Sequence, residues 1–136
     1  MDYHIDPADK KILVIDGEYG VVTPLEFLLA HNGYVVKTAY NGEDALKLVS
    51  TFMPDLILLD ILTPVIDGFQ LCQTIRENKR YRDMKIIFLT AIVRDVDIAK
   101  GLALGADACI TKPFSNAALI KTLKEVFSGI KNGTKE

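Results

Sequence analysis

The sequence is short of cysteine, of basic charge and of long hydrophobic runs, and each shortage excludes a class of function. Its two cysteines, Cys72 and Cys109, form no Cys-x-x-Cys pair, so we expect both to be reduced and buried, with no metal role. The chain carries 16 lysine and arginine residues against 18 aspartate and glutamate residues. With this near-neutral balance and no long basic block, we expect no direct nucleic-acid binding.

The same shortages bear on localisation. No apolar stretch approaches the roughly 20 residues that a membrane span needs. The N-terminal residues MDYHIDPADKK contain no apolar core of a signal peptide. We therefore expect a cytoplasmic protein with no membrane contact.

Length and composition predict one globular domain. The 136 residues are 49% hydrophobic and 25% charged, and the mean hydropathy of +0.20 is typical of a sheet covered on both faces. We expect a single domain over residues 1–136, with a core of about 11–128 and a polar tail at 129–136.

Apolar runs alternate with segments of helical periodicity. Runs rich in Ile, Val and Leu have the length of strands at 12–15, 34–39, 56–59, 86–89 and 108–111. The intervening helices have candidate N-caps at Thr23, Asn41, Asp67, Asp95 and Ser115. The first of these opens Thr23-Pro24-Leu25-Glu26, a capping box with proline at the first helical position. The alternation predicts an α/β fold, a doubly wound (βα)5 parallel sheet with the flavodoxin-like strand order 2-1-3-4-5.

Polar residues follow four of the expected strands, namely Asp16, Asp60, Thr90 and Lys112. In parallel α/β sheets functional groups gather at the carboxyl ends of the strands. Two neighbouring carboxylates repel each other, and Mg²⁺ relieves that repulsion through oxygen ligands. An ammonium and a hydroxyl can both bind phosphoryl oxygens. Each residue alone has a structural explanation, but together they favour phosphoryl transfer onto an aspartate.

The sequence resembles the receiver domain of bacterial response regulators from about residue 11 to 127. The matching segments are ILVID, NGEDAL, PDLILLDILTPVIDGFQLC, IIFLTA and GLALGADACITKPFS. The resemblance implies that Asp60 is the phosphoacceptor. It also implies that the hydroxyl of Thr90 follows the phosphoryl group during switching, and that Lys112 pairs with the phosphoryl oxygens.

The resemblance further implies a metal site and a cis-proline. Asp16 matches the first acid of the family's metal-binding pair, and Leu62 matches the position whose backbone carbonyl binds Mg²⁺. The metal residues expected are therefore Asp16, Asp60 and Leu62. Pro113 matches a proline usually preceded by a cis peptide bond, which would aim Lys112.

Departures from the family pattern concern the metal and the switch. The family usually reads Asp-Asp-Glu after the first strand, whereas this chain has Asp16-Gly17-Glu18. Since Gly17 replaces the acid that normally touches the metal, we expect weakened Mg²⁺ binding. Glu18 is an alternative ligand, although its family position normally points elsewhere. Cys109 replaces an aromatic residue of the usual switch, and Val65 stands where glycine is common.

The expected function is a two-component receiver, which is not an enzyme. It would take a phosphoryl group on Asp60 from a sensor histidine kinase or phosphotransfer protein and signal by conformational switching to a downstream protein partner. The alternative is a pseudo-receiver, a phosphorylation-independent interaction module. Phosphatases of the haloacid dehalogenase type need a second aspartate where this chain has Leu62. Flavodoxins need a phosphate loop that DGEYGVV does not supply.

Overall fold

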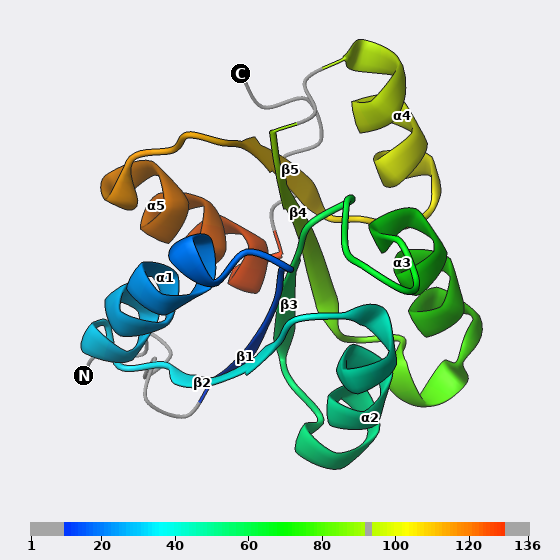
Figure 1. Ribbon diagram of the computed structural model, residues 1–136, viewed down its shortest axis with the longest axis horizontal. Coiled ribbons are helices and arrows are strands. Elements are labelled where there is room, and N and C mark those ends of the chain that lie inside the picture. Colours follow the sequence, from blue (N-terminus) through cyan, green and yellow to red (C-terminus); the bar gives the residue numbers. More distant parts are fainter. Residues whose placement is uncertain (1–9, 92–93, 130–136) are drawn as a thin grey trace.

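A five-stranded parallel sheet lies between two layers of helices (Figure 1) in the computed structural model, which describes residues 10–91 and 94–129. The elements are β1 (Lys11–Ile15), α1 (Tyr19–His31), β2 (Val35–Ala39), α2 (Gly42–Phe52), β3 (Leu56–Leu59), α3 (Gly68–Glu77), the 3-10 helix η2 (Lys79–Tyr81), β4 (Lys85–Thr90), α4 (Asp95–Ala103), β5 (Ala108–Thr111) and α5 (Asn116–Phe127). The strand order β2-β1-β3-β4-β5 confirms the predicted topology.

Parts of the sequence expectations fall beyond the described residues. All of the predicted polar tail except residue 129 lies outside them, as does most of the segment before β1. Within the described ranges, no helix combines the length and the apolar character that crossing a membrane requires.

Helices bury both faces of the sheet, which explains the continuous apolar strands. Helices α1 and α5 cover one face, and α2, α3 and α4 lie on the other (Figure 1). Every residue of β3 is buried. The register aligns β1 with β3 so that Ile15 pairs with Leu59. The residues that follow these strands, Asp16 and Asp60, therefore emerge at the same edge of the sheet.

Local capping rules predicted three helix starts correctly. The side chains of Asn41, Asp67 and Ser115 each accept a hydrogen bond from a backbone amide three residues ahead, at the starts of α2, α3 and α5. Such a bond satisfies an amide that has no partner within the helix. These starts depend only on neighbouring residues, which is why sequence alone found them.

The predicted start of the first helix was wrong. Helix α1 has Glu18 as its N-cap and contains Pro24 within it. The Glu18 carbonyl accepts the amides of Val21 and Val22 at 3.0 and 3.1 Å, so the helix is established before Thr23. Val22 is fully buried in the core beneath α1. Burial of this turn outweighs the local capping pattern.

The predicted N-cap of the fourth helix was also wrong, by one residue. Asp95 is the first helical residue of α4, and Arg94 is the N-cap without a side-chain capping bond. The Arg94 guanidinium instead donates to the Asp97 carboxylate at 2.7 and 3.2 Å. Acids in the first helical turn interact favourably with the helix dipole, so Asp95 still suits its position.

Candidate functional site

Asp16 and Asp60 lie next to each other at the carboxyl edge of the sheet. The Asp60 amide donates a hydrogen bond to the Ile15 carbonyl at 3.0 Å, which continues the pairing of β1 with β3. Both acids are buried, with 2% of Asp16 and 7% of Asp60 exposed. Because carboxylates this close repel each other in a poorly hydrated site, the arrangement requires a cation.

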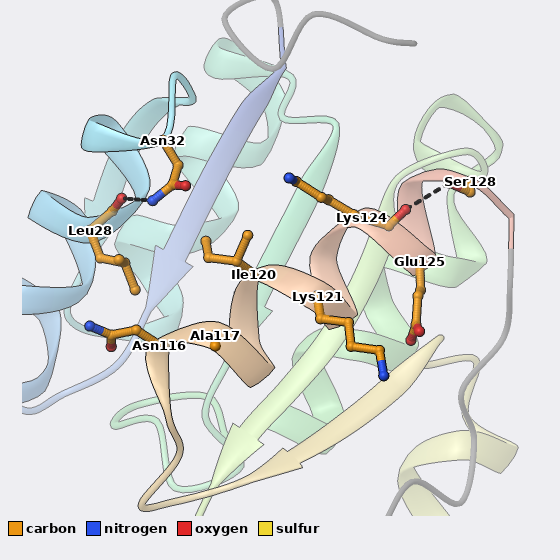
Figure 2. A pocket seen from close by; sticks show the side chains of 9 residues that line it. All are labelled: Leu28, Asn32, Asn116, Ala117, Ile120, Lys121, Lys124, Glu125 and Ser128. Atoms are coloured by element: carbon orange, nitrogen blue, oxygen red, sulfur yellow. Dashed lines mark hydrogen bonds between the residues drawn. The ribbon is translucent and has the colours of Figure 1, made fainter.

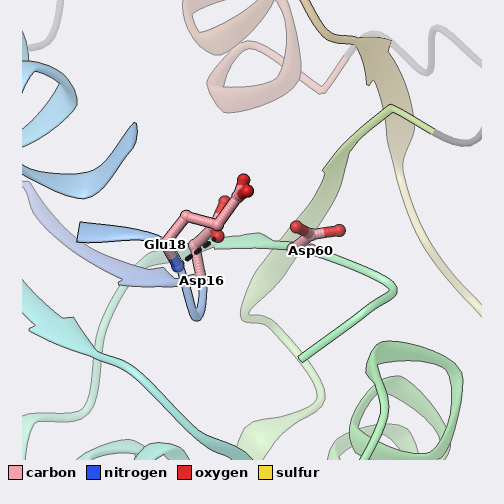
Figure 3. A group of neighbouring side chains, drawn as sticks. All are labelled: Asp16, Glu18 and Asp60. Carbon is pink, nitrogen blue, oxygen red and sulfur yellow. Dashed lines mark hydrogen bonds between the residues drawn. The ribbon is translucent and has the colours of Figure 1, made fainter. Parts of the chain in front are cut away.

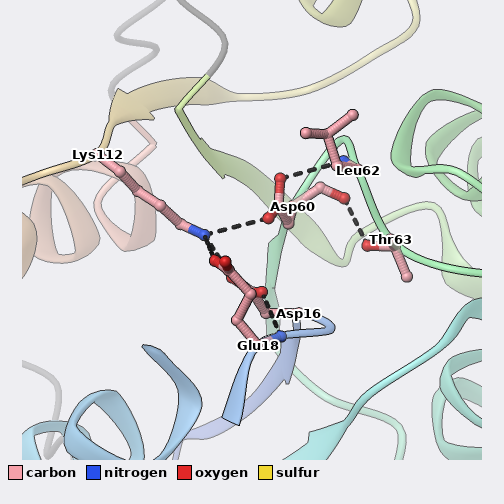
Figure 4. Close-up of polar contacts among 6 residues, drawn as sticks. All are labelled: Asp16, Glu18, Asp60, Leu62, Thr63 and Lys112. Carbon is pink, nitrogen blue, oxygen red and sulfur yellow. Dashed lines mark hydrogen bonds and ion pairs between the residues drawn. The ribbon is translucent and has the colours of Figure 1, made fainter. Parts of the chain in front are cut away.

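Lys112 supplies a cation to both acids. It follows β5, and its Nζ donates hydrogen bonds to Asp16 Oδ2 at 2.6 Å and to Asp60 Oδ2 at 3.1 Å (Figure 4). Its backbone amide donates to the Thr90 carbonyl at 2.9 Å, which fixes the start of the side chain at the end of β4. Three groups that are far apart in sequence thus meet at one point.

Burial and pairing oppose each other in the titration of these groups. Burial raises the pKa of Asp16 above its ordinary value, although hydrogen bonds from Lys112 and the Glu18 amide lower it. Burial lowers the pKa of Lys112, but hydrogen bonds with Asp16 and Asp60 outweigh burial and leave that pKa above its ordinary value. Lys112 is therefore protonated at neutral pH.

Glu18 brings a third carboxylate to the pair. Its Oε1 lies 3.6 Å from Lys112 Nζ, and its backbone amide donates to Asp16 Oδ1 at 3.0 Å. One carboxylate oxygen each from Asp16, Glu18 and Asp60 lies within 4.8 Å of the others (Figure 3). Hard cations such as Mg²⁺ take oxygen ligands of this kind. The donor set therefore fits the metal that the sequence predicts.

These groups surround a pocket of about 300 Å³. It is lined by Asp16, Gly17, Glu18, Asp60, Leu62, Pro64, Ala91 and Lys112. The lining thus includes the Asp60 side chain and the residues that follow β1, β3, β4 and β5. Asp16, Asp60 and Lys112 are largely buried, whereas the side chain of Glu18 is 70% exposed.

The other residues expected at the site lie at the same edge. Thr90 is the last residue of β4 and is 3% exposed, and its neighbour Ala91 lines the pocket. The Leu62 amide donates to Asp60 Oδ1 at 3.1 Å, which places its backbone next to the acid. The peptide bond between Lys112 and Pro113 is cis.

The sequence did not predict the roles of Thr63 and Pro64. The buried Thr63 hydroxyl donates to the Asp60 carbonyl at 2.6 Å (Figure 4), which holds the loop after β3 in place. Pro64 packs against Gly17, where an added Cβ would lie 2.9 Å from Pro64 Cδ. The only sequence signal was the position of both residues three and four places after the strand-end acid.

The cysteines are free, but only one is fully buried. Cys72 has no exposed surface, whereas Cys109 is partly buried, contrary to expectation. Cys109 pairs with Phe88 in the register of β4 and β5. It is partly open because β5 forms an edge of the sheet. Burial nevertheless raises the pKa of each thiol to about 11.

A larger hollow, of about 660 Å³, lies between α1 and α5 (Figure 2). It is lined by Leu28, Asn32, Asn116, Ala117, Ile120, Lys121, Lys124, Glu125 and Ser128. None of the strand-end residues contributes to it. The smaller pocket beside Asp60, called the acidic pocket below, therefore contains the acids and the lysine that could bind a phosphoryl group.

Comparison with known proteins agrees with this geometry. The family model of the response regulator receiver domain matches residues 12–124. The alkaline phosphatase synthesis transcriptional regulatory protein PhoP of Bacillus subtilis is 47% identical over 107 residues, which is 79% of this chain and 44% of that protein. The chain thus spans less than half the length of this relative.

Solved structures of response regulators and their receiver domains are also similar to this chain. The chemotaxis response regulator CheY4 of Vibrio cholerae is 31% identical with a TM-score of 0.81, covering 86% of this chain and 98% of that one. The BeF3-activated receiver domain of RstA from Klebsiella pneumoniae is 29% identical with a TM-score of 0.79, covering 84% and 95% of the two chains.

Proposed function

Because this chain belongs to the response regulator receiver domain family, we propose that Asp60 accepts a phosphoryl group from a histidine kinase or a phosphotransfer protein. The observation that carries the proposal is the contact of Lys112 Nζ with both Asp60 and Asp16 inside the acidic pocket. A structural salt bridge would need only one acid. A second buried carboxylate beside an open pocket supports a site that binds a phosphoryl group together with the cation that offsets its charge.

In this proposal an Asp60 carboxylate oxygen attacks the phosphorus of a phosphohistidine donor. The new P–O bond forms as the bond between phosphorus and the imidazole nitrogen breaks, and the electron pair of that bond stays on the nitrogen. Lys112 Nζ, now 3.1 Å from Asp60 Oδ2, transfers its hydrogen bond to a phosphoryl oxygen. The Thr90 hydroxyl at the end of β4 binds another oxygen.

The same residues suit Mg²⁺. Asp16, Asp60 and the Leu62 carbonyl would hold the ion, with Glu18 as the nearest further acid. When bound, Mg²⁺ offsets the negative charge of the carboxylates and of the phosphoryl group. Position 17 offers no carboxylate, so we propose a lower affinity than a site with an acid there would have.

Phosphorylation would act by shifting the population of two conformers. Moving Lys112 and Thr90 towards the phosphoryl group changes contacts at the ends of β4 and β5. A downstream protein partner in the cytoplasm would bind the phosphorylated conformer. Since the chain spans 44% of the Bacillus subtilis regulator, that partner can be another protein or a further part of the same polypeptide.

The test is phosphorylation by a small donor. Wild-type protein is incubated with acetyl phosphate and Mg²⁺, and intact mass is measured before and after hydroxylamine, which cleaves acyl phosphates. We expect one phosphoryl adduct that is absent from Asp60→Asn. The matched control is Asp83→Asn, which makes the same change at an exposed acid just before β4, at the opposite edge of the sheet.

Each outcome has a clear meaning. An adduct that persists in Asp60→Asn refutes Asp60 as the acceptor. Absence of any adduct on wild-type protein, under conditions that phosphorylate another receiver, favours an interaction module that works without phosphorylation. Loss of the adduct in both variants points to a folding defect, which circular dichroism of the two proteins would reveal.

A further inference from the structure

The acidic pocket has an acid in an unexpected place. Position 17 carries no side chain, so the turn after β1 supplies only one buried carboxylate, Asp16. The next residue, Glu18, is largely exposed, but its side chain lines the pocket and lies beside Asp16 (Figure 3). A carboxylate oxygen of Glu18 thus joins those of Asp16 and Asp60 within a 4.8 Å cluster.

An acid at position 17 would require Pro64 to shift. A Cβ at Gly17 would lie 2.9 Å from Cδ and 3.0 Å from Cγ of Pro64. The Pro64 carbonyl accepts the amides of Gly42 and Ile66, each at 2.9 Å, so the proline is held in place. Glu18 has no such restriction, since most of its side chain is exposed.

We propose that Glu18 is a direct ligand of the divalent cation in this chain and takes the role that Gly17 leaves open. This inference rests on the proposed function, because it assumes a metal at the acidic pocket. Carboxylate oxygens on one side of a small pocket are the ligands that Mg²⁺ prefers. The Glu18 carboxylate lies 3.6 Å from Lys112 Nζ, which is long for an ion pair. Turning this carboxylate to a metal would therefore break only a weak interaction with Lys112.

The alternative role for Glu18 is that of a nearby charge. As a ligand, it would contact the metal at short range, where salt has little effect. As a nearby charge, it would act through solvent, and salt would screen its effect as the Debye length falls from about 10 Å at 0.1 M to about 3 Å at 1 M. The two roles therefore differ in their dependence on ionic strength.

The experiment measures Mn²⁺ affinity by electron paramagnetic resonance of the free ion, with Mg²⁺ affinity obtained by competition. Wild type, Glu18→Gln and Glu77→Gln are compared at 0.1 and 1 M KCl, roughly the two conditions above. Glu77 is an exposed acid at the end of α3, so its variant makes the same charge change away from the pocket. The readout is binding, independent of phosphorylation.

We expect Glu18→Gln to weaken Mn²⁺ binding on the order of tenfold to a hundredfold at both salt concentrations. Glu77→Gln should remain within about twofold of wild type. Equal affinities of Glu18→Gln and wild type would overturn the inference, as would a difference that disappears at 1 M KCl. Wild type that binds no Mn²⁺ would overturn it too.

The inference and the proposed function can fail separately. If Mn²⁺ affinity ignores Glu18 while wild type is phosphorylated on Asp60, the inference fails and the proposed function stands. If Glu18→Gln weakens metal binding while wild type gives no Asp60 adduct, the metal role of Glu18 stands and the proposed function fails.

Discussion

Replacing Gly17 with alanine should destabilise the fold, although alanine is usually the more favourable residue. The new Cβ would lie 2.9 Å from Pro64 Cδ and 3.7 Å from the Tyr40 carbonyl oxygen. Carbon atoms in contact are normally separated by about 3.5–4.0 Å. The Pro64 ring cannot rotate away, and the hydrogen bonds to its carbonyl from Gly42 and Ile66 hold the loop.

The magnitude follows from two opposing terms. Overpacking costs about 1–3 kcal/mol, and replacing glycine lowers the entropy of the unfolded chain, which restores about 0.4–1 kcal/mol. The middle of each range gives a net loss of about 1.3 kcal/mol. The same contact limits Gly17→Asp, because any carboxylate added there must first displace Pro64.

The assay is urea unfolding followed by far-ultraviolet circular dichroism, with comparable slopes for all variants. Gly20→Ala is the matched control, because a Cβ at this residue of α1 meets nothing within 4 Å. Its helical position predicts a gain of up to about 1 kcal/mol. Gly17→Ala combined with Pro64→Ala should lose less stability than the two changes added together, since the clashing ring is gone. If Gly17→Ala is as stable as wild type and the pair shows no coupling, the steric reasoning is wrong.

Two further predictions concern a strained residue and the thiols. Val65 has a φ of 75° and is 77% exposed, so Val65→Gly should raise the free energy of unfolding by up to about 1 kcal/mol, because a β-branched residue is strained there; a lower urea midpoint would contradict this. Because burial raises the pKa of Cys72 and Cys109 to about 11, fewer thiolates form in the folded state. Iodoacetamide at about pH 8 should alkylate the folded protein on the order of a hundredfold more slowly than the urea-unfolded protein. Equal alkylation rates, measured by mass spectrometry, would show that burial does not raise the pKa of these thiols.

The sequence was sufficient wherever a short-range rule governs the structure. Alternating apolar runs and helical segments predicted the parallel sheet, and the usual topology of such sheets predicted the strand order; the structure confirms both. Three helix caps were correct because a capping side chain bonds to an amide only a few residues away. The start of α1 was wrong because Val22 is buried in the core, and burial depends on what packs against it.

The candidate site shows the same division. The sequence predicted that Asp16, Asp60 and Lys112 lie at one edge of the sheet, because parallel strands bring their carboxyl ends together there, and the structure places them in contact. Only the tertiary structure determined that Pro64 occupies the space beside Gly17 and that the Glu18 carboxylate turns back towards the pocket. These contacts join loops that are distant in sequence, and their geometry depends on side-chain packing and backbone hydrogen bonds that no local pattern encodes.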